Sequence, residues 1–259
     1  MNENPTAVDR PGADVGTPAV TQPELPRPWG FWSTLCWGLL AFGLWGAVVA
    51  GAIVWLNWGQ IANLPDIQED PWFPLQLTLA NMLQIAVLAW AARLAGWPVG
   101  QYLGLVRPRA RDLVAGIAAL AALVLGLEIL THVLQRESVT PFQTEAYRVA
   151  RAAGLLPLLW IAFVIAAPVA EEIFFRGFLF RGWAASPLGV PGTILLTSCI
   201  FSASHVQYDW FGMFQTFCIS MLFGWLRWRS GSTTVTILMH MAINFIATLW
   251  AAAKVEGLV

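Results

Sequence analysis

Charged side chains are scarce in this chain of 259 residues. Asp, Glu, Lys and Arg make up 11% of the sequence, whereas 58% of it is hydrophobic and the mean hydropathy is +0.63. A soluble domain needs a more polar surface, so this composition predicts an integral membrane protein with the lipid bilayer as its solvent. The net charge of -1 supplies no basic face, which argues against nucleic acid as a partner.

Cysteine is also rare. Cys36, Cys199 and Cys218 each lie alone inside an apolar run. Cysteines in such positions behave as small hydrophobic residues, so the sequence predicts neither a disulfide framework nor a thiolate metal site.

Large apolar residues are nearly missing from residues 1–30, which contain six prolines. Such a segment cannot bury enough surface to offset its chain entropy, so we expect a disordered Pro-rich tail. The first apolar run begins at Phe31 and is longer than the core of a secretory signal. This run is therefore expected to remain as a membrane helix.

Apolar runs of about 20 residues, enough to cross a bilayer, follow one another from Phe31 onward. They predict an all-α, polytopic transmembrane helix bundle with seven or eight spans. The expected spans are 31–56, 75–94, 113–134, 155–183, 193–206, 211–228 and 235–253, the last of which could be broken in two. We divide them into N-terminal transmembrane helices (31–153) and a bundle with unusual polar residues (154–253).

Arginines in the short loops predict the orientation. The loop between the second and third spans contains Arg107, Arg109 and Arg111, whereas the loop between the first two contains acids and no base. Because Lys and Arg accumulate in cytoplasmic loops, the N-terminus is expected to be cytoplasmic. The chain is thus expected to be a multi-pass protein of the cell (inner) membrane.

Three ionisable residues, Glu171, Glu172 and Arg176, fall inside the fourth span. Each costs about 2.5–3.5 kcal/mol at a span centre, so such residues indicate a functional site. Glu172 and Arg176 are four residues apart and could equally be a structural ion pair on one helix face. Glu171 points about 100° away from Glu172, which leaves it available as a catalytic base.

Two histidines occur in apolar surroundings farther along the chain. His205 ends the fifth span, and His240 lies four residues before Asn244 in the last span. This spacing places His240 and Asn244 on one helical stripe. A lone histidine is usually a packing residue, but two of them together with Asn244 and Glu171 favour one shared polar site.

A second pair with the same spacing, Glu128 and His132, lies toward the end of the third span. Water is close there, and no further polar partner is nearby in the sequence. We therefore expect this pair to face the bundle interior or the membrane interface without a functional role.

The polar residues form three motifs in order. These are Glu-Glu-x-x-x-Arg at 171–176, Phe-x-x-x-His at 201–205 and His-x-x-x-Asn at 240–244. With Pro168 before and Gly177 after the first motif, they resemble the CPBP family of intramembrane endopeptidases, which includes the type II CAAX prenyl proteases and Abi bacteriocin-immunity relatives. The resemblance covers about 155–247; the first half matches only as apolar spans.

The resemblance implies an intramembrane endopeptidase. Glu171 and His205 would activate a water for attack on a peptide carbonyl, and His240 and Asn244 would stabilise the oxyanion. Glu172 and Arg176 would be supporting charges. The family has also been described as metallopeptidases, so Glu171, His205 and His240 are alternative ligands for Zn²⁺. The implied substrates are peptides or proteins in or at the membrane, including lipidated ones.

Other intramembrane proteases lack support. The sequence contains no His-Glu-x-x-His, no Gly-x-Ser-Gly and no Gly-Asp pair, which excludes the zincin-like, rhomboid and presenilin classes. Two other functions stay open: a proton-coupled transporter, which would need repeated broken helices, and a non-enzymatic immunity or scaffold protein of the same fold.

Overall fold

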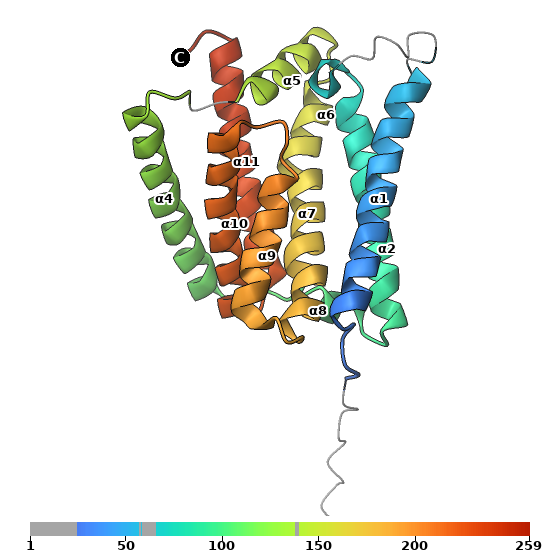
Figure 1. Cartoon of the computed structure of the whole chain (residues 1–259). Coiled ribbons are helices and arrows are strands. Elements are labelled where there is room, and N and C mark those ends of the chain that lie inside the picture. Colours follow the sequence, from blue (N-terminus) through green and yellow to red (C-terminus); the bar gives the residue numbers. More distant parts are fainter. Residues whose placement is uncertain (1–24, 57, 59–65, 138–139) are drawn as a thin grey trace, which may run out of the picture.

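The computed structural model describes residues 25–56, 58, 66–137 and 140–259. These residues form helices, turns and loops without any strand, which confirms the predicted all-α class (Figure 1). Most of the expected disordered tail, residues 1–24, lies outside the described residues. Its last part, 25–30, is non-helical, and the Trp29 indole donates a hydrogen bond to the Ala91 carbonyl at 2.9 Å.

The N-terminal half supplies three long helices and two short ones. They are α1 (Phe31–Leu56), η2 (Ile67–Glu69), α2 (Phe73–Leu94), α3 (Val99–Tyr102) and α4 (Ala110–Val133). α1 and α2 pack together at one edge of the bundle, and α4 stands at the opposite edge (Figure 1). α4 packs mainly on α10 and α11, so most of its surface faces outward.

An additional helix, α5 (Pro141–Ala152), lies across one end of the bundle (Figure 1). The spans expected from the sequence leave this segment in a loop. Its start signals are nevertheless present, since the Thr140 hydroxyl accepts a hydrogen bond from the Gln143 amide and Pro141 opens the first turn. With 12 residues, α5 is too short to cross a bilayer.

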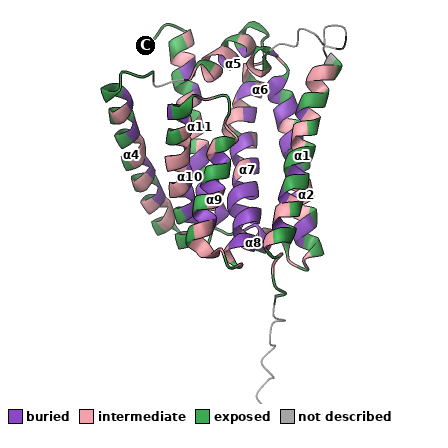
Figure 2. Ribbon diagram, viewed as in Figure 1, coloured by how far each residue is buried: buried purple, intermediate pink, exposed green. Residues whose placement is uncertain are grey.

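The fourth span is one continuous helical run with changing geometry. It consists of α6 (Leu156–Trp160), the π-helix η3 (Ile161–Ala166), α7 (Ala167–Glu172), the π-helix η4 (Ile173–Leu179) and α8 (Phe180–Ala184). π-helical turns are rare in proteins overall, but those that do occur are often found at functional sites. Here they flank the short α7 that carries both glutamates, in the most buried part of the fold (Figure 2).

The last three helices are α9 (Gly189–Ala203), α10 (Trp210–Ser230) and α11 (Thr233–Val255). α11 is unbroken, so the expected division of the last span does not occur. Five described helical segments are long and apolar enough to cross a membrane: Phe31–Trp55, Phe73–Leu94, Ala110–Val133, Leu156–Ala184 and Thr233–Val255. Seven or eight spans are not confirmed, because α9 has only 15 residues and α10 contains several polar and charged ones.

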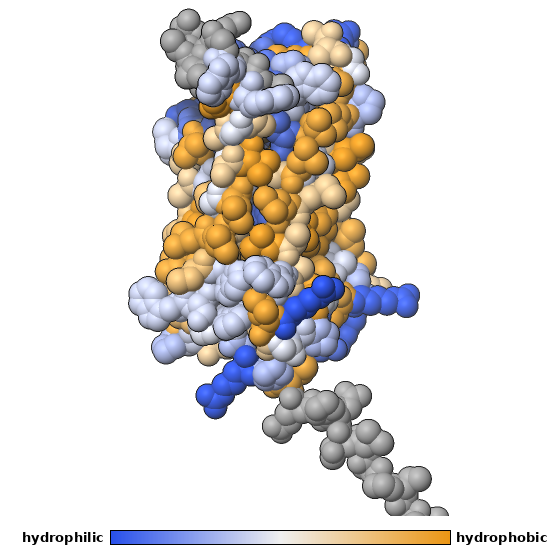
Figure 3. Space-filling model, turned by 90° about the vertical axis from the view of Figure 1, so that its right-hand side faces the viewer, coloured by the Kyte–Doolittle hydropathy of each residue, from blue (hydrophilic) through white to orange (hydrophobic). Residues whose placement is uncertain are grey.

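The outer surface agrees with an integral membrane protein. On the face of the molecule shown in Figure 3, hydrophobic side chains cover the middle, and hydrophilic residues gather above and below. α4 carries exposed Val114, Ile117 and Leu125 on its outer side. Exposed apolar rows of this length are stable only against lipid.

Candidate active site

The centre of the site is a buried ion pair between Glu172 and Arg176. Nη1 of Arg176 lies 3.0 Å from Oε1 of Glu172, and the two side chains are 1% and 0% exposed. Nη2 of Arg176 donates to the carbonyl and to the hydroxyl of Ser220 on α10, at 2.9 and 2.6 Å. The guanidinium also lies 4.9 Å from the Phe201 ring centre. These contacts fix the pair between η4, α9 and α10.

His240 of α11 joins this pair. Its Nδ1 lies 3.0 Å from Oε1 of Glu172. An ionised carboxylate only accepts hydrogen bonds, so Nδ1 carries a proton and donates to Glu172. Nε2 lies 3.7 Å from Oε2 of Glu171, which is within ion-pair range but too long for a hydrogen bond. The Glu171 side chain is 31% exposed, so it remains open to water where Glu172 is not.

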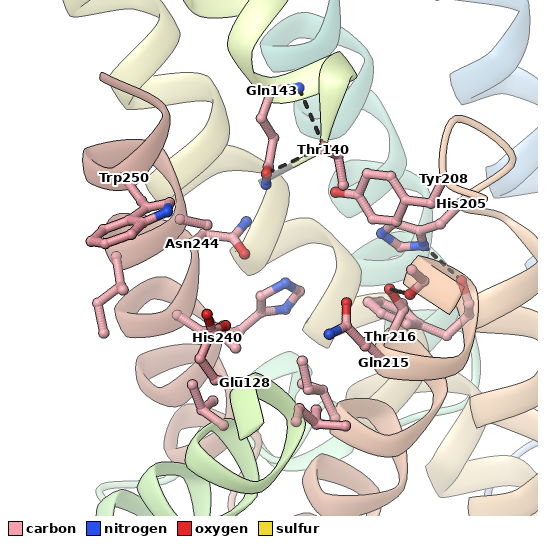
Figure 4. A pocket seen from close by; sticks show the side chains of 18 residues that line it. Glu128, Thr140, Gln143, His205, Tyr208, Gln215, Thr216, His240, Asn244 and Trp250 are labelled. Atoms are coloured by element: carbon pink, nitrogen blue, oxygen red, sulfur yellow. Dashed lines mark hydrogen bonds between the residues drawn. The ribbon is translucent and has the colours of Figure 1, made fainter. Parts of the chain in front are cut away.

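His205 lies in the turn that follows α9. Its Nδ1 is 2.7 Å from the Phe201 carbonyl oxygen, so Nδ1–H donates and Nε2 of the neutral ring is left as an acceptor. Figure 4 shows that this second nitrogen faces the cavity. The centre of the Phe201 ring lies 4.7 Å from that of the His205 ring and 5.9 Å from that of the His240 ring, so this ring packs against both histidines.

A cavity of about 410 Å³ brings three of the predicted residues together. His205, His240 and Asn244 all line it (Figure 4). Nδ2 of Asn244 donates to the Phe163 carbonyl of η3 at 2.9 Å, which ties α11 to the π-helical segment. The remaining polar or titratable lining residues are Glu128, Thr140, Gln143, Tyr208, Gln215 and Thr216.

Tyr208 was not identified from the sequence. It lines the cavity three residues after His205, and its ring centre lies 5.5 Å from the His205 ring. Burial and the nearby negative charge of Glu171 raise the pKa of Tyr208 to about 12. The phenol therefore keeps its proton at neutral pH and can donate a hydrogen bond. No spacing rule used on the sequence singles out this residue.

Glu128, which the sequence predicted to face the bundle interior or the membrane interface, lines the same cavity as the two histidines (Figure 4). α4 reaches the cavity because it packs on α10 and α11. The Gln215 amide also donates to the Thr131 hydroxyl at 2.9 Å, which holds α10 against α4 beside this carboxylate.

The alternative Zn²⁺ ligands expected from the resemblance are Glu171, His205 and His240. Among the described residues, no three His, Cys, Asp or Glu side chains are grouped closely enough to hold a metal ion. Glu171 and His240 are neighbours at 3.7 Å, and the Phe201 ring contacts both histidine rings, but the three expected ligands do not form such a group.

Residues 153–246 match the family described as type II CAAX prenyl endopeptidase Rce1-like. The matched segment runs from the end of α5 into α11 and contains all three motifs. For this segment it confirms the resemblance that the motifs indicated, while the first 152 residues lie outside the match. No curated protein and no solved structure matches the chain.

Proposed function

We propose that this integral membrane protein is an endopeptidase that hydrolyses a peptide bond near the membrane face. The observation that supports this most is the shared cavity of His205, His240 and Asn244, with Glu171 3.7 Å from His240. Histidine and amide groups that line one cavity, with a carboxylate beside it, can activate a water and stabilise an oxyanion.

Glu171 and His205 are the proposed bases. Nδ1–H of His205 is held by the Phe201 carbonyl, so its Nε2 can accept a hydrogen bond from a water in the cavity and orient it. Glu171, the more exposed of the two glutamates, takes one proton from this water. The resulting hydroxide adds to the peptide carbonyl carbon, and the proton then passes to the leaving amine as the C–N bond breaks.

His240 and Asn244 are the proposed oxyanion donors. Asn244 uses one N–H for the Phe163 carbonyl and keeps a second N–H for the substrate oxygen. Because Nδ1 of His240 donates to Glu172, Nε2 can donate only when the ring is an imidazolium. The oxyanion role therefore requires a positively charged His240, with the carboxylates of Glu171 and Glu172 as its neighbours.

Hydrolysis can be tested with the purified protein in lipid nanodiscs. The substrates are quenched fluorescent peptides, with and without a farnesylated cysteine, with and without a chelator. We expect cleavage that disappears in Glu171→Gln and His205→Ala. Two matched surface variants, Glu145→Gln and His132→Ala, should cleave normally. Cleavage that persists in both site variants would falsify the mechanism, and sensitivity to the chelator would indicate metal dependence.

Peptide binding in the same nanodiscs and a proton-flux measurement in closed vesicles separate hydrolysis from the other two functions. A scaffold or immunity protein would bind peptides without cleaving them in any variant. A proton-coupled transporter would instead acidify vesicles in response to solute, with Glu171→Gln abolishing that response.

A further inference from the structure

The cavity opens toward one end of the bundle. Its lining residues belong to α5, to the turn before α10, to the first turns of α10 and to α4 and α11. Glu128 lies about 27 Å along α4 from its first residue, at 1.5 Å per residue, and about 8 Å from its last. None of the described lining residues comes from loops 95–109, 185–188 or 231–232, which join helices at the other end.

Buried aromatic side chains close the opposite direction. Phe178 and Phe223 are fully buried, and Phe175 is 4% exposed. Phe175 and Phe178 follow the motif glutamates in η4, and Phe223 lies in the second half of α10. Both segments run away from the cavity. A peptide therefore reaches His205 and His240 from the α5 side.

The two ends differ in charge. We call the end with loops 95–109, 185–188 and 231–232 the arginine end, and the end with α5 the cavity end. The described bases of the arginine end are Arg27, Arg93, Arg107, Arg109, Arg111, Arg181, Arg227 and Arg229, against the acid Asp112. The bases of the cavity end are Arg136, Arg148, Arg151 and Lys254, against Asp66, Glu69, Asp70, Glu137, Glu145, Asp209 and Glu256. The excess of arginine marks the arginine end as cytoplasmic.

We infer that the cavity opens on the non-cytoplasmic side of the membrane and that its substrate is a membrane-anchored peptide segment exposed on that side. This inference rests on the proposed function. The lining residues Ile246 and Trp250 are 59% and 47% exposed on the outer surface of α11, which gives the cavity an apolar flank. An anchor in the outer leaflet can pack on this flank while the peptide enters the cavity.

Cysteine accessibility tests the orientation without any activity. Cys36, Cys199 and Cys218 are first replaced by alanine. Single cysteines are then placed at the cavity end, as Gln143→Cys or Arg148→Cys, and at the arginine end, as Arg109→Cys. Intact cells are treated with a membrane-impermeant maleimide. We expect labelling of the two cavity-end cysteines in intact cells and of Arg109→Cys only after permeabilisation; the reverse pattern overturns the inference.

Sidedness of cleavage tests the substrate. A quenched peptide with an N-terminal acyl anchor is added to right-side-out and to inverted vesicles. We expect cleavage in right-side-out vesicles, at least tenfold faster than in inverted ones. Faster cleavage in inverted vesicles overturns the inference. The cysteine pattern can be as expected while no peptide is cleaved in either vesicle type or in the nanodiscs. The proposed function and the proposed substrate then both fail, and the orientation stands.

Discussion

Oε1 of Glu172 lies 3.0 Å from Nδ1 of His240 and the same distance from Nη1 of Arg176. One carboxylate oxygen thus holds both a guanidinium and a catalytic-site imidazole. This contact sets which ring nitrogen of His240 faces Glu171. In the proposed mechanism the two adjacent glutamates have different tasks, positioning for Glu172 and proton transfer for Glu171.

Alanine variants of the two glutamates should therefore behave differently. Glu172→Ala leaves Arg176 buried without its carboxylate, so we expect the free energy of unfolding to fall by about 3–5 kcal/mol. Glu171→Ala removes a partly exposed group and should change stability by less than about 1 kcal/mol while lowering kcat at least 100-fold. Denaturation in detergent and peptide hydrolysis measure the two effects, and equal stabilities would contradict the division of roles.

Asn244→Ala should lower kcat by about 10²–10³-fold, since it removes one oxyanion donor. It also removes the bond to the Phe163 carbonyl, so part of the loss can come from a displaced η3. Thermal unfolding of the variant separates the causes. If kcat falls, KM for weakly bound peptides is unchanged and the melting temperature is lowered, the displacement of η3 is the cause. If the melting temperature is unchanged, the loss of the oxyanion donor is the cause.

Glu128→Gln should raise KM for peptides with a basic residue near the cleaved bond by roughly three- to tenfold, with little change in kcat. The physical reason is the loss of one negative charge from the cavity wall, worth about 1 kcal/mol. His132→Gln, one turn farther along α4, is the matched control. If peptide charge has no influence on either KM, Glu128 has no part in substrate binding.

Acidification should loosen α4 from α11. Lys254 donates a hydrogen bond to Glu137, and this bond together with the charge of Lys254 lowers the pKa of Glu137. A carboxyl with a lowered folded-state pKa contributes stability above its unfolded pKa and loses it as the pH falls through the folded value. Hydrogen exchange at the C-terminal turn of α4 should speed up over this acid range, and Glu137→Gln should remove that pH dependence.

Gly104 should be less replaceable than Gly154. Both have positive φ, at +67° and +71°, but an added Cβ at Gly104 would lie 2.6 Å from Nη2 of Arg227 and 2.9 Å from the Thr233 hydroxyl. At Gly154 nothing lies within 4 Å. Gly154→Ala should cost about 1–2 kcal/mol from backbone strain alone, and Gly104→Ala clearly more. Equal melting temperatures of the two variants would contradict this prediction, because the loop at Gly104 would then accommodate the added Cβ without extra cost.

Local spacing could be predicted from the sequence. The Glu172–Arg176 pair and the common stripe of His240 and Asn244 follow from helical periodicity, and both occur in the structure. The membrane class and the family follow from composition and motifs. The roles assigned to Glu171, His205, His240 and Asn244 stay predictions.

Contacts between distant segments could not be predicted. Tyr208 and Glu128 meet the motif residues only because the turn before α10 and the far half of α4 surround α11. The search for apolar runs of about 20 residues also did not predict α5, because an amphipathic surface helix contains no such run. The π-helical geometry of η3 and η4 depends on packing and has no periodic signature in these apolar runs.

The π-helical segment η3 acts as a one-residue spacer in the fourth span. A π-turn holds an extra residue relative to an α-turn, and the Phe163 carbonyl within it accepts its hydrogen bond from Asn244. Deleting a single residue between Ile161 and Ala166 would let the turn tighten into an ordinary α-helix. The helix on one side of the deletion would then rotate by about 100° against the other. The extra residue of η3 thus sets the direction of Glu171 relative to the start of the fourth span.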